Sequence, residues 1–83
     1  MERVALFPGS FDPFTRGHQA IVEQGLALFD RVVVAIGYNP SKHGLLDVES
    51  RKRLIEKVYQ NEPRVEVVAY TTLTGEEAQR VGA

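Results

Sequence analysis

The 83-residue sequence contains no cysteine and no tryptophan, and it has a single methionine. Without cysteine it can form neither disulfide bonds nor thiolate metal sites, which is typical of proteins from a reducing compartment. Long apolar runs are also missing. The segment Val4–Phe7 is stopped by Pro8 and is far too short to act as a signal peptide or to span a bilayer. We therefore expect a cytoplasmic protein that does not enter the membrane.

An excess of charge of either sign is absent as well. Ten Lys and Arg residues oppose eleven Asp and Glu residues, and the formal net charge is −1. Such a balance provides no general attraction to nucleic acids or to anionic membranes, so neither is expected as a partner. We assign no metal-binding residue. The length corresponds to one small domain or to part of a larger one.

Three segments have the composition of β-strands. Val4–Phe7 and Val32–Gly37 are continuous apolar runs, as expected for strands of a parallel sheet that are buried on both faces. Val65–Tyr70 is rich in β-branched residues and follows a proline. These segments predict three strands.

Amphipathic helices are predicted between the strands. The first covers Gly17–Phe29 with Thr15 as its cap, and its apolar side chains are Ile21, Leu26, Leu28 and Phe29. The second covers Val48–Tyr59 with Asp47 as its cap, and its apolar side chains are Leu54, Ile55, Val58 and Tyr59. A third, weaker helix is predicted over Gly75–Val81.

The resulting order is β-α-β-α-β-α, which predicts an α/β fold with a parallel sheet and right-handed crossovers. Three strands make a thin sheet for this class. Val81–Ala83 resembles the end of a helix that would lead into another strand. We therefore expect a chain that is truncated within a domain.

Most of the chemically informative residues lie between the first strand and the first helix, in Pro8–His18. This loop leaves the carboxyl end of a strand, where α/β sheets bind their ligands. Gly9 and Gly17 would allow a close approach of the backbone to a ligand. Ser10 offers a hydroxyl, and His18 lies in the first helical turn, where free N–H groups and the helix dipole favour phosphate. The glycine spacing fits neither a Walker loop nor the G-x-G-x-x-G fingerprint.

Taken alone, a histidine in the first turn of a helix is usually a capping or surface residue. Here Thr15 and Gly17-His18 resemble the T-x-G-H variant of the H-x-G-H signature of the nucleotidyltransferase superfamily. The run Phe7–His18 resembles the phosphopantetheine adenylyltransferase family in particular. Nicotinamide mononucleotide adenylyltransferases usually carry Asn-Pro-Pro-His before the Gly-His, and cytidylyltransferases usually carry Asp-Leu-Leu-His. Asn39–Lys42 resembles the loop that carries the phosphate-binding lysine of the pantetheine family.

This resemblance implies transfer of the adenylyl group of ATP to 4′-phosphopantetheine, giving dephospho-coenzyme A and pyrophosphate in coenzyme A biosynthesis. Catalysis in this family consists of positioning and charge stabilisation. By the resemblance, His18 would donate a hydrogen bond near the α-phosphate, and its helix N-terminus would favour the neutral form. Ser10 would reach the phosphates of both substrates, and Phe11 would offer backbone contacts to ATP. Lys42 would bind the phosphate of phosphopantetheine, and Mg²⁺ would screen the triphosphate.

The resemblance also implies a three-layer, Rossmann-like nucleotidyltransferase fold with strand order 3-2-1-4-5, of which residues 1–83 are the N-terminal half of one domain. The family is typically hexameric, which implies a homo-oligomer. Thr74 stands where the family contacts the pantetheine arm, commonly with Leu or Met, and Gly75–Glu77 also depart from the pattern. Two alternatives stay open at this point. One is an inactive fragment that binds phosphate weakly, and the other is a related adenylyl- or cytidylyltransferase with a different acceptor.

Overall fold

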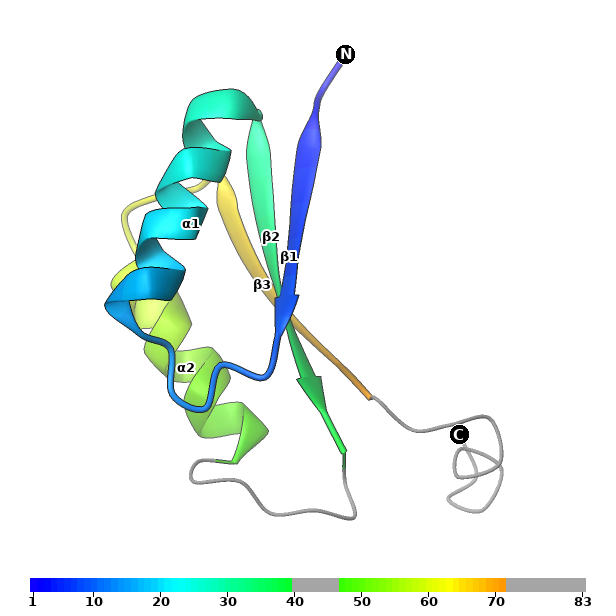
Figure 1. The fold of residues 1–83 in the computed structure, drawn as a ribbon, viewed down its shortest axis with the longest axis vertical. Helices are drawn as coiled ribbons and strands as arrows, with labels where there is room; N and C mark the ends of the chain where they lie inside the picture. Colours follow the sequence, from blue (N-terminus) through cyan, green and yellow to red (C-terminus); the bar gives the residue numbers. More distant parts are fainter. Residues whose placement is uncertain (40–46, 72–83) are drawn as a thin grey trace.

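The computed structural model describes residues 1–39 and 47–71. The elements in this part of the chain are β1 (Val4–Gly9), α1 (Arg16–Leu28), β2 (Arg31–Tyr38), α2 (Val48–Val58) and β3 (Val65–Thr71) (Figure 1). Each strand is one or two residues longer than the sequence predicted. The helix predicted over Gly75–Val81 lies outside the described residues.

The three strands form one parallel sheet in the order β1-β2-β3, which confirms the predicted parallel arrangement. Both helices lie on the same face of this sheet (Figure 1). The described residues therefore make two layers, and the third layer of the predicted architecture has no member among them. Because the strands are parallel, their carboxyl ends meet at one edge, where the loop from β1 to α1 also lies.

Each helix is capped by the residue that the sequence predicted, although α1 begins at Arg16, one residue before its predicted start. The Thr15 hydroxyl accepts a hydrogen bond from the backbone N–H of His18 and caps α1. The Asp47 carboxylate accepts from the N–H of Ser50 at 2.7 Å and caps α2. Capping satisfies backbone donors that have no partner within the helix. In the described part of the chain, neither helix is both long and apolar enough to cross a membrane.

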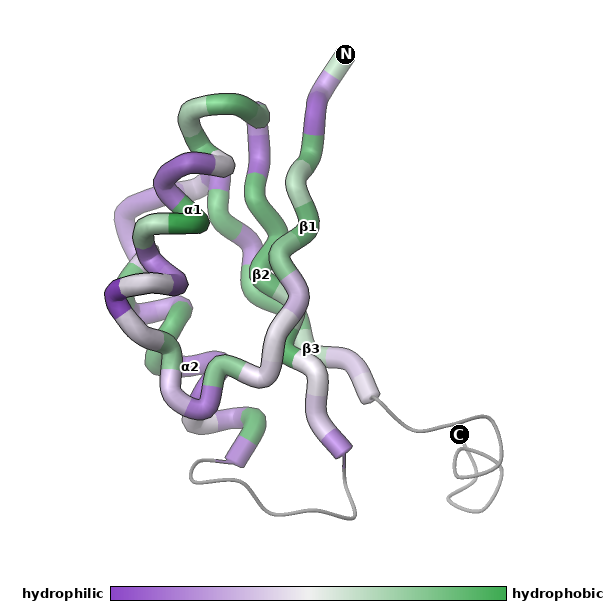
Figure 2. The backbone as a smooth tube through the Cα atoms, in the orientation of Figure 1, coloured by the Kyte–Doolittle hydropathy of each residue, from purple (hydrophilic) through white to green (hydrophobic). Residues whose placement is uncertain are grey.

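The core lies between β2 and the two helices. Val32, Val34 and Ile36 of β2 are almost fully buried, and they pack with Val22 of α1 and Ile55 of α2. Figure 2 shows the same concentration of hydrophobic residues along the strands, whereas the helices are mixed. Because β2 is the central strand and is covered by helices, it has the continuous apolar sequence that predicted it.

The apolar side of α1 was only partly predicted. Leu26 packs against the core as expected, but Ile21, Leu28 and Phe29 are exposed, and Val22 and Gly25 face the sheet. A methyl group at Gly25 would lie 2.9 Å from Cγ2 of Val32, so the helix packs closely on β2 at this glycine. The prediction of the buried side of α1 used only the large apolar residues. It did not consider that a glycine can lie at a helix–strand contact.

The apolar side of α2 was also only partly predicted. Ile55 is fully buried, but Leu54 and Val58 are exposed. The second buried residue of this helix is Arg51, which donates a hydrogen bond to the loop between β1 and α1.

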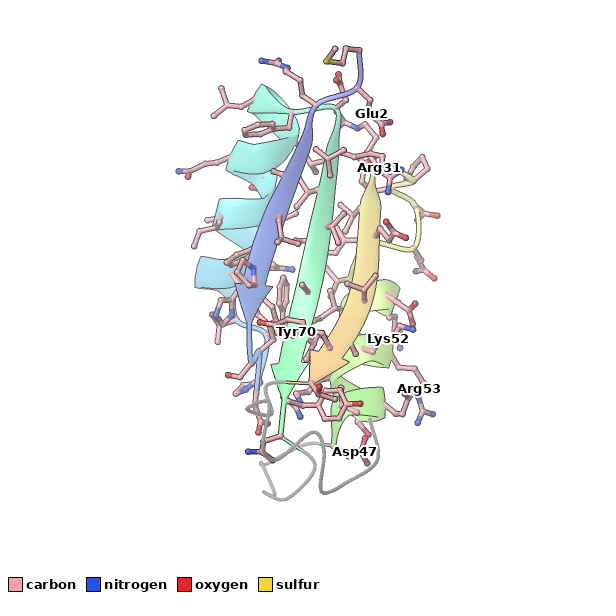
Figure 3. The ribbon with its side chains drawn as sticks, turned by 90° about the vertical axis from the view of Figure 1, so that its right-hand side faces the viewer. Glu2, Arg31, Asp47, Lys52, Arg53 and Tyr70 are labelled. Atoms are coloured by element: carbon pink, nitrogen blue, oxygen red, sulfur yellow. The ribbon has the colours of Figure 1, made fainter. Side chains whose placement is uncertain are left out.

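The sheet face without helices is open in the described part of the structure. Along β1, burial alternates, and Val4 and Leu6 point away from the helices, with Leu6 66% exposed. At the amino ends of the strands, Arg31 forms an ion pair with Glu66 at 2.6 Å and another at 3.6 Å with Glu2, which is labelled beside it in Figure 3. These charged residues limit the apolar area at that end of the face.

We expect Asp47→Ala to lower the stability of the protein at neutral pH. The hydrogen bond from the backbone N–H of Ser50 holds the pKa of the Asp47 carboxyl below its usual range. Because the folded-state pKa is lowered, the contribution of this carboxylate is complete above the pKa of the unfolded state and disappears as the pH falls through the folded-state pKa. Urea denaturation of the wild type and of Asp47→Ala at several pH values measures the free energy of unfolding. The difference between the two proteins should become smaller as the pH is lowered.

Asp47→Asn is the matched control, because the asparagine side chain also accepts a hydrogen bond at an N-cap but does not titrate. A stability difference between wild type and Asp47→Ala that is the same at pH 7 and at pH 2 would contradict this description of the cap.

Candidate active site

The candidate site is the loop from β1 to α1, residues 10–15, together with the first turn of α1. The loop leaves the sheet at the carboxyl end of β1 and turns back to the start of the helix (Figure 1). It contains Ser10, which is exposed, and Phe11, whose ring lies 5.0 Å from that of His18 between centroids. Lys42 and Thr74 lie outside the described residues.

His18 takes part in the capping of its own helix. Its Nδ1 atom accepts a hydrogen bond from the backbone N–H of Thr15 at 2.8 Å, and the Thr15 hydroxyl lies 3.0 Å from the same atom. In return, the hydroxyl accepts from the backbone N–H of His18. This is a reciprocal capping box in which histidine takes the place usually held by Glu or Gln.

The capping box determines which ring nitrogen of His18 can be a donor. A backbone N–H can only donate, so Nδ1 must present its lone pair to Thr15. The neutral imidazole therefore carries its proton on Nε2. In this arrangement His18 offers one N–H donor, from Nε2, at the N-terminus of α1. The first turn of this helix contains no acidic residue, so the positive end of its dipole is not offset locally.

Three aromatic rings surround the imidazole of His18. Phe11 meets it edge to face, Phe14 stacks on it at a centroid distance of 5.4 Å and an interplanar angle of 27°, and Phe7 lies at 6.1 Å. Such contacts restrict the rotation of the imidazole ring. The rings and the capping box together fix where Nε2 can point, which is the requirement for a hydrogen-bond donor that acts in catalysis.

Phe11 is the structural centre of the loop. It is 2% exposed, and its φ of 50° lies in the left-handed region, which is uncommon for a residue with a side chain. A methyl group at Gly9 would lie 2.9 Å from Cζ of Phe11. The sequence suggested that Gly9 would let a ligand approach the backbone, but in the structure this space holds the Phe11 ring. At Gly17 a methyl group would meet only Thr15, at an ordinary 3.6 Å.

Arg51 contacts the loop of the candidate site, and the sequence analysis did not assign it to this site. It is 7% exposed, and its Nη1 donates a hydrogen bond to the carbonyl of Ser10 at 2.7 Å. Its position four residues before Ile55 was an available signal, since residues at this spacing share one face of a helix.

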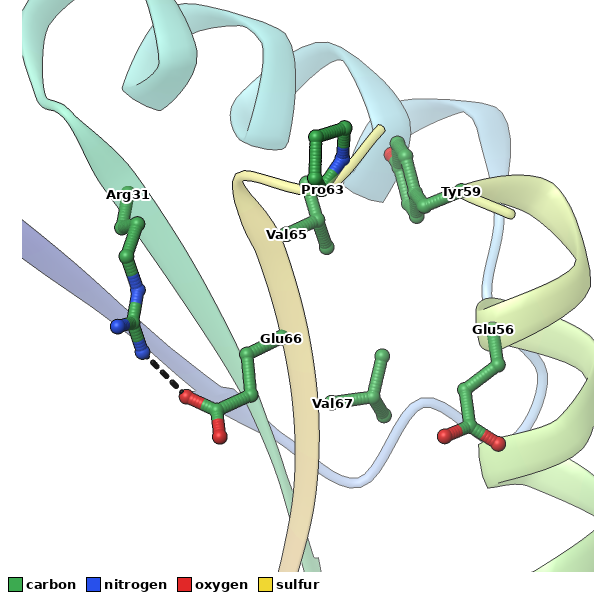
Figure 4. A pocket seen from close by; sticks show the side chains of 7 residues that line it. All are labelled: Arg31, Glu56, Tyr59, Pro63, Val65, Glu66 and Val67. Atoms are coloured by element: carbon green, nitrogen blue, oxygen red, sulfur yellow. Dashed lines mark hydrogen bonds and ion pairs between the residues drawn. The ribbon is translucent and has the colours of Figure 1, made fainter. Parts of the chain in front are cut away.

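A separate pocket of about 560 Å³ lies at the other end of the sheet (Figure 4). It opens beside the first residues of β2 and β3, and the side chains around it are Arg31, Glu56, Tyr59, Pro63, Val65, Glu66 and Val67. Burial raises the pKa of the Tyr59 hydroxyl above its usual value, and the charge of Glu23 adds to this effect. This pocket contains none of the residues that the sequence placed in the candidate site.

The residues described offer no ready metal centre. Among residues 1–39 and 47–71, no three His, Asp or Glu side chains are grouped so that they could hold an ion. The loop offers hydrogen-bond donors from the Nε2 of His18, the Ser10 hydroxyl and the start of α1. Donors of this kind, close to the positive end of a helix dipole, suit a phosphorylated ligand.

Several known proteins are similar to this chain. The family model described as cytidylyltransferase-like matches residues 6–83. A phosphopantetheine adenylyltransferase of Flavobacterium johnsoniae is 50% identical over 72 residues, which cover 87% of this chain and 47% of the relative. That of Anaeromyxobacter sp. (strain K) is 49% identical over 82 residues, which cover 99% of this chain and 50% of the relative. The chain thus spans about half the length of these curated relatives.

Solved structures show the same fold. The NadR protein in complex with NAD and AMP-PNP superposes with a TM-score of 0.77 at 21% identity, covering 99% of this chain and 26% of that protein. NadR in complex with NR gives a TM-score of 0.80 at 22% identity, covering 98% of this chain and 25% of that protein. The fold is the Rossmann-like α/β fold that the sequence predicted. By the match over almost its whole length, the chain belongs to the cytidylyltransferase-like family.

Proposed function

We propose that this chain is part of an enzyme that transfers the adenylyl group of ATP to 4′-phosphopantetheine. The observation that carries the proposal is the arrangement of His18, whose Nε2–H donor is fixed by the Thr15 cap at the start of α1. The relatives named phosphopantetheine adenylyltransferase support the choice of acceptor, because they are about half identical to this chain across nearly all of it.

In the proposed reaction, a phosphate oxygen of 4′-phosphopantetheine attacks the α-phosphorus of ATP. A new P–O bond forms while the bond from the α-phosphorus to the bridging oxygen breaks, and pyrophosphate leaves. No protein nucleophile is needed, so the protein accelerates the reaction by aligning the substrates and stabilising charge. The Nε2–H of His18 would bind an α-phosphate oxygen as charge develops on it. The Ser10 hydroxyl and the N–H of Phe11 would hold the phosphates nearby.

The remaining substrate and cofactor roles rest on the resemblance of the sequence. Lys42 would neutralise the phosphate of 4′-phosphopantetheine, and Thr74 would contact the pantetheine arm. Mg²⁺ would be held by the phosphate oxygens of ATP. When bound, the ion would supply screening of the triphosphate charge. A homohexamer is proposed on the same basis.

The proposal is tested with the full-length protein that contains this sequence. ATP and CTP are offered as donors, and 4′-phosphopantetheine and nicotinamide mononucleotide as acceptors, with release of pyrophosphate as the readout. We expect turnover with ATP and 4′-phosphopantetheine, and mass spectrometry should identify dephospho-coenzyme A. Preferred use of CTP or of nicotinamide mononucleotide would show that the enzyme is a related transferase with another specificity.

Lys42→Ala is expected to act mainly on the acceptor. Loss of a charged hydrogen bond to phosphate should raise the KM for 4′-phosphopantetheine by about tenfold or more, with a smaller change for ATP. Lys52→Ala, which removes a lysine from α2 outside the loop, is the control and should leave both KM values unchanged. The role of Lys42 is wrong if dephosphorylated pantetheine is as good a substrate as the phosphorylated form.

A further inference from the structure

We propose that Arg51 is a positioning residue of this site, because it holds the Ser10–Phe11 peptide group so that the N–H of Phe11 faces the phosphates of the nucleotide. The inference rests on the proposed function, because it assigns a nucleotide to the loop. It adds a residue from α2 to a site that the sequence placed in the loop before α1.

The contacts of Arg51 link two separate parts of the chain. Its Nη1 donates to the carbonyl of Ser10 at 2.7 Å, and its Nε donates to the carbonyl of Asp47 at 3.4 Å. The side chain is 7% exposed although it carries a full charge. Burial of a guanidinium is costly unless its donors are satisfied, so a buried arginine that bonds to a residue 41 positions away in the sequence needs an explanation.

The geometry of the peptide group gives that explanation. The cis peptide bond among the described residues is Asp12-Pro13, so the bond between Ser10 and Phe11 is trans. In a planar trans peptide the C=O and the following N–H point in opposite directions. Because Arg51 holds the carbonyl of Ser10, the N–H of Phe11 points away from Arg51 and α2. One side of the peptide group is therefore occupied by the protein, and the other side presents a donor.

Phe11 is constrained from two directions. Its ring is buried against Phe7, Phe14 and His18, and its backbone has a φ of 50°. Since this region is sparsely populated for residues with a side chain, contacts on both sides of the residue are needed to maintain it. The buried ring fixes the side chain, and Arg51 fixes the peptide group before it. Removing Arg51 should leave the ring in place and allow the peptide group to rotate.

The charge of Arg51 should also favour a phosphate at the N–H of Phe11. The described hydrogen bonds of Arg51 go to the main-chain carbonyls of Ser10 and Asp47, which carry no formal charge. The Asp47 carboxylate interacts with the charge of Arg51 and offsets part of it. The remaining positive potential adds to the positive end of the α1 dipole beside the loop. A phosphate at the N–H of Phe11 would be attracted by both.

The test compares Arg51→Met, Arg51→Lys and Arg53→Met in the full-length protein. Methionine keeps much of the length of the side chain and removes the charge and the hydrogen bonds. We expect Arg51→Met to weaken ATP binding, measured by calorimetry, by about 10- to 100-fold, the scale for losing a hydrogen bond that involves a charged group. The KM for 4′-phosphopantetheine should change little. Arg51→Lys, which keeps the charge, should recover part of the loss.

Arg53→Met is the matched control, because Arg53 lies on the same helix and is exposed. It should bind ATP as the wild type does. In addition, the amide resonance of Phe11 should shift when ATP is added to the wild type and should shift less in Arg51→Met. Melting temperatures of all variants show whether each protein is folded, and if Arg51→Met does not fold, the partial loss in Arg51→Lys decides the question.

The outcomes separate this inference from the proposed function. A wild type that binds ATP but does not adenylylate 4′-phosphopantetheine would refute the proposed acceptor, while ATP affinity would still decide the role of Arg51. A lower melting temperature in Arg51→Met with unchanged ATP affinity would overturn the positioning role, because it is the result expected of a purely structural residue. A wild type that does not bind ATP would overturn both.

Discussion

Replacement of His18 by alanine in the full-length protein is expected to lower kcat for adenylyl transfer by about 10²–10³-fold or more, with little change in ATP affinity. The reason is that the Nε2–H of His18 is a donor fixed in place by the Thr15 cap and by three aromatic rings. The hydrogen bond from a fixed donor is strongest where negative charge develops. Its loss should therefore destabilise mainly the transition state. Steady-state kinetics with both substrates, together with ATP titration by calorimetry, separate the two effects.

Because His18 also caps α1, its removal could act through the helix. Thr15→Val is the control, since it removes the capping hydroxyl but keeps the imidazole and the backbone N–H that donates to Nδ1. We expect a much smaller loss of kcat in Thr15→Val than in His18→Ala. A His18→Ala protein with the kcat of the wild type would contradict the assignment of this residue.

Phe11→Ala is expected to lower the free energy of unfolding by about 3–5 kcal/mol, the usual cost of removing a buried phenylalanine ring. The ring is 2% exposed, it contacts Phe7, Phe14 and His18, and it fills the space that Gly9 leaves. Its removal would leave a cavity beneath the loop. Denaturant titration of the full-length protein, followed by circular dichroism, measures the change.

Phe29→Ala is the control for this substitution. Phe29 is 37% exposed at the end of α1, where Arg3 lies over its ring. Its truncation should therefore cost much less than that of Phe11. If both substitutions lowered stability equally, the loop would not contain the buried centre that we describe.

The elements of the fold followed directly from the sequence. Continuous apolar runs located β1 and β2, and Thr15 and Asp47 located the first turn of each helix. These signals are local, because strands of a parallel sheet have few polar residues and a helix start needs a side-chain acceptor. The predicted burial of β1 on both faces was wrong for the described part of the structure, since Val4 and Leu6 are exposed. The order of the strands required the resemblance to a family, since alternation of strands and helices does not give the order.

Side-chain positions were less predictable. In α1 the helix packs on the sheet through Val22 and Gly25, and the larger Ile21 and Leu28 remain exposed. Helical spacing identifies residues that can share a face, but close packing at a glycine is decided by the partner strand. Arg51 illustrates the same limit, because arginine is usually exposed and its partner, Ser10, lies far away in the sequence.

The roles of the site residues were predicted from the T-x-G-H motif and the Asn39–Lys42 run, and they remain predictions. What the structure adds is the orientation of His18. The sequence could place a histidine in the first turn of a helix, but it could not show that Nδ1 accepts from Thr15 or that Phe14 stacks on the ring. Both depend on the path of the loop, which turns at Phe11.

The tautomer of His18 tests the central claim most directly, because the proposed donor exists only if the proton is on Nε2. Two-bond ¹H–¹⁵N correlation spectra of the full-length protein distinguish the two ring nitrogens. We expect the Nδ1 resonance of an unprotonated acceptor, an Nε2 that carries the proton, and a shift of Nε2 when ATP is added. A neutral ring protonated on Nδ1, or an Nε2 resonance that does not respond to ATP, would contradict the role of His18 as the donor to the nucleotide.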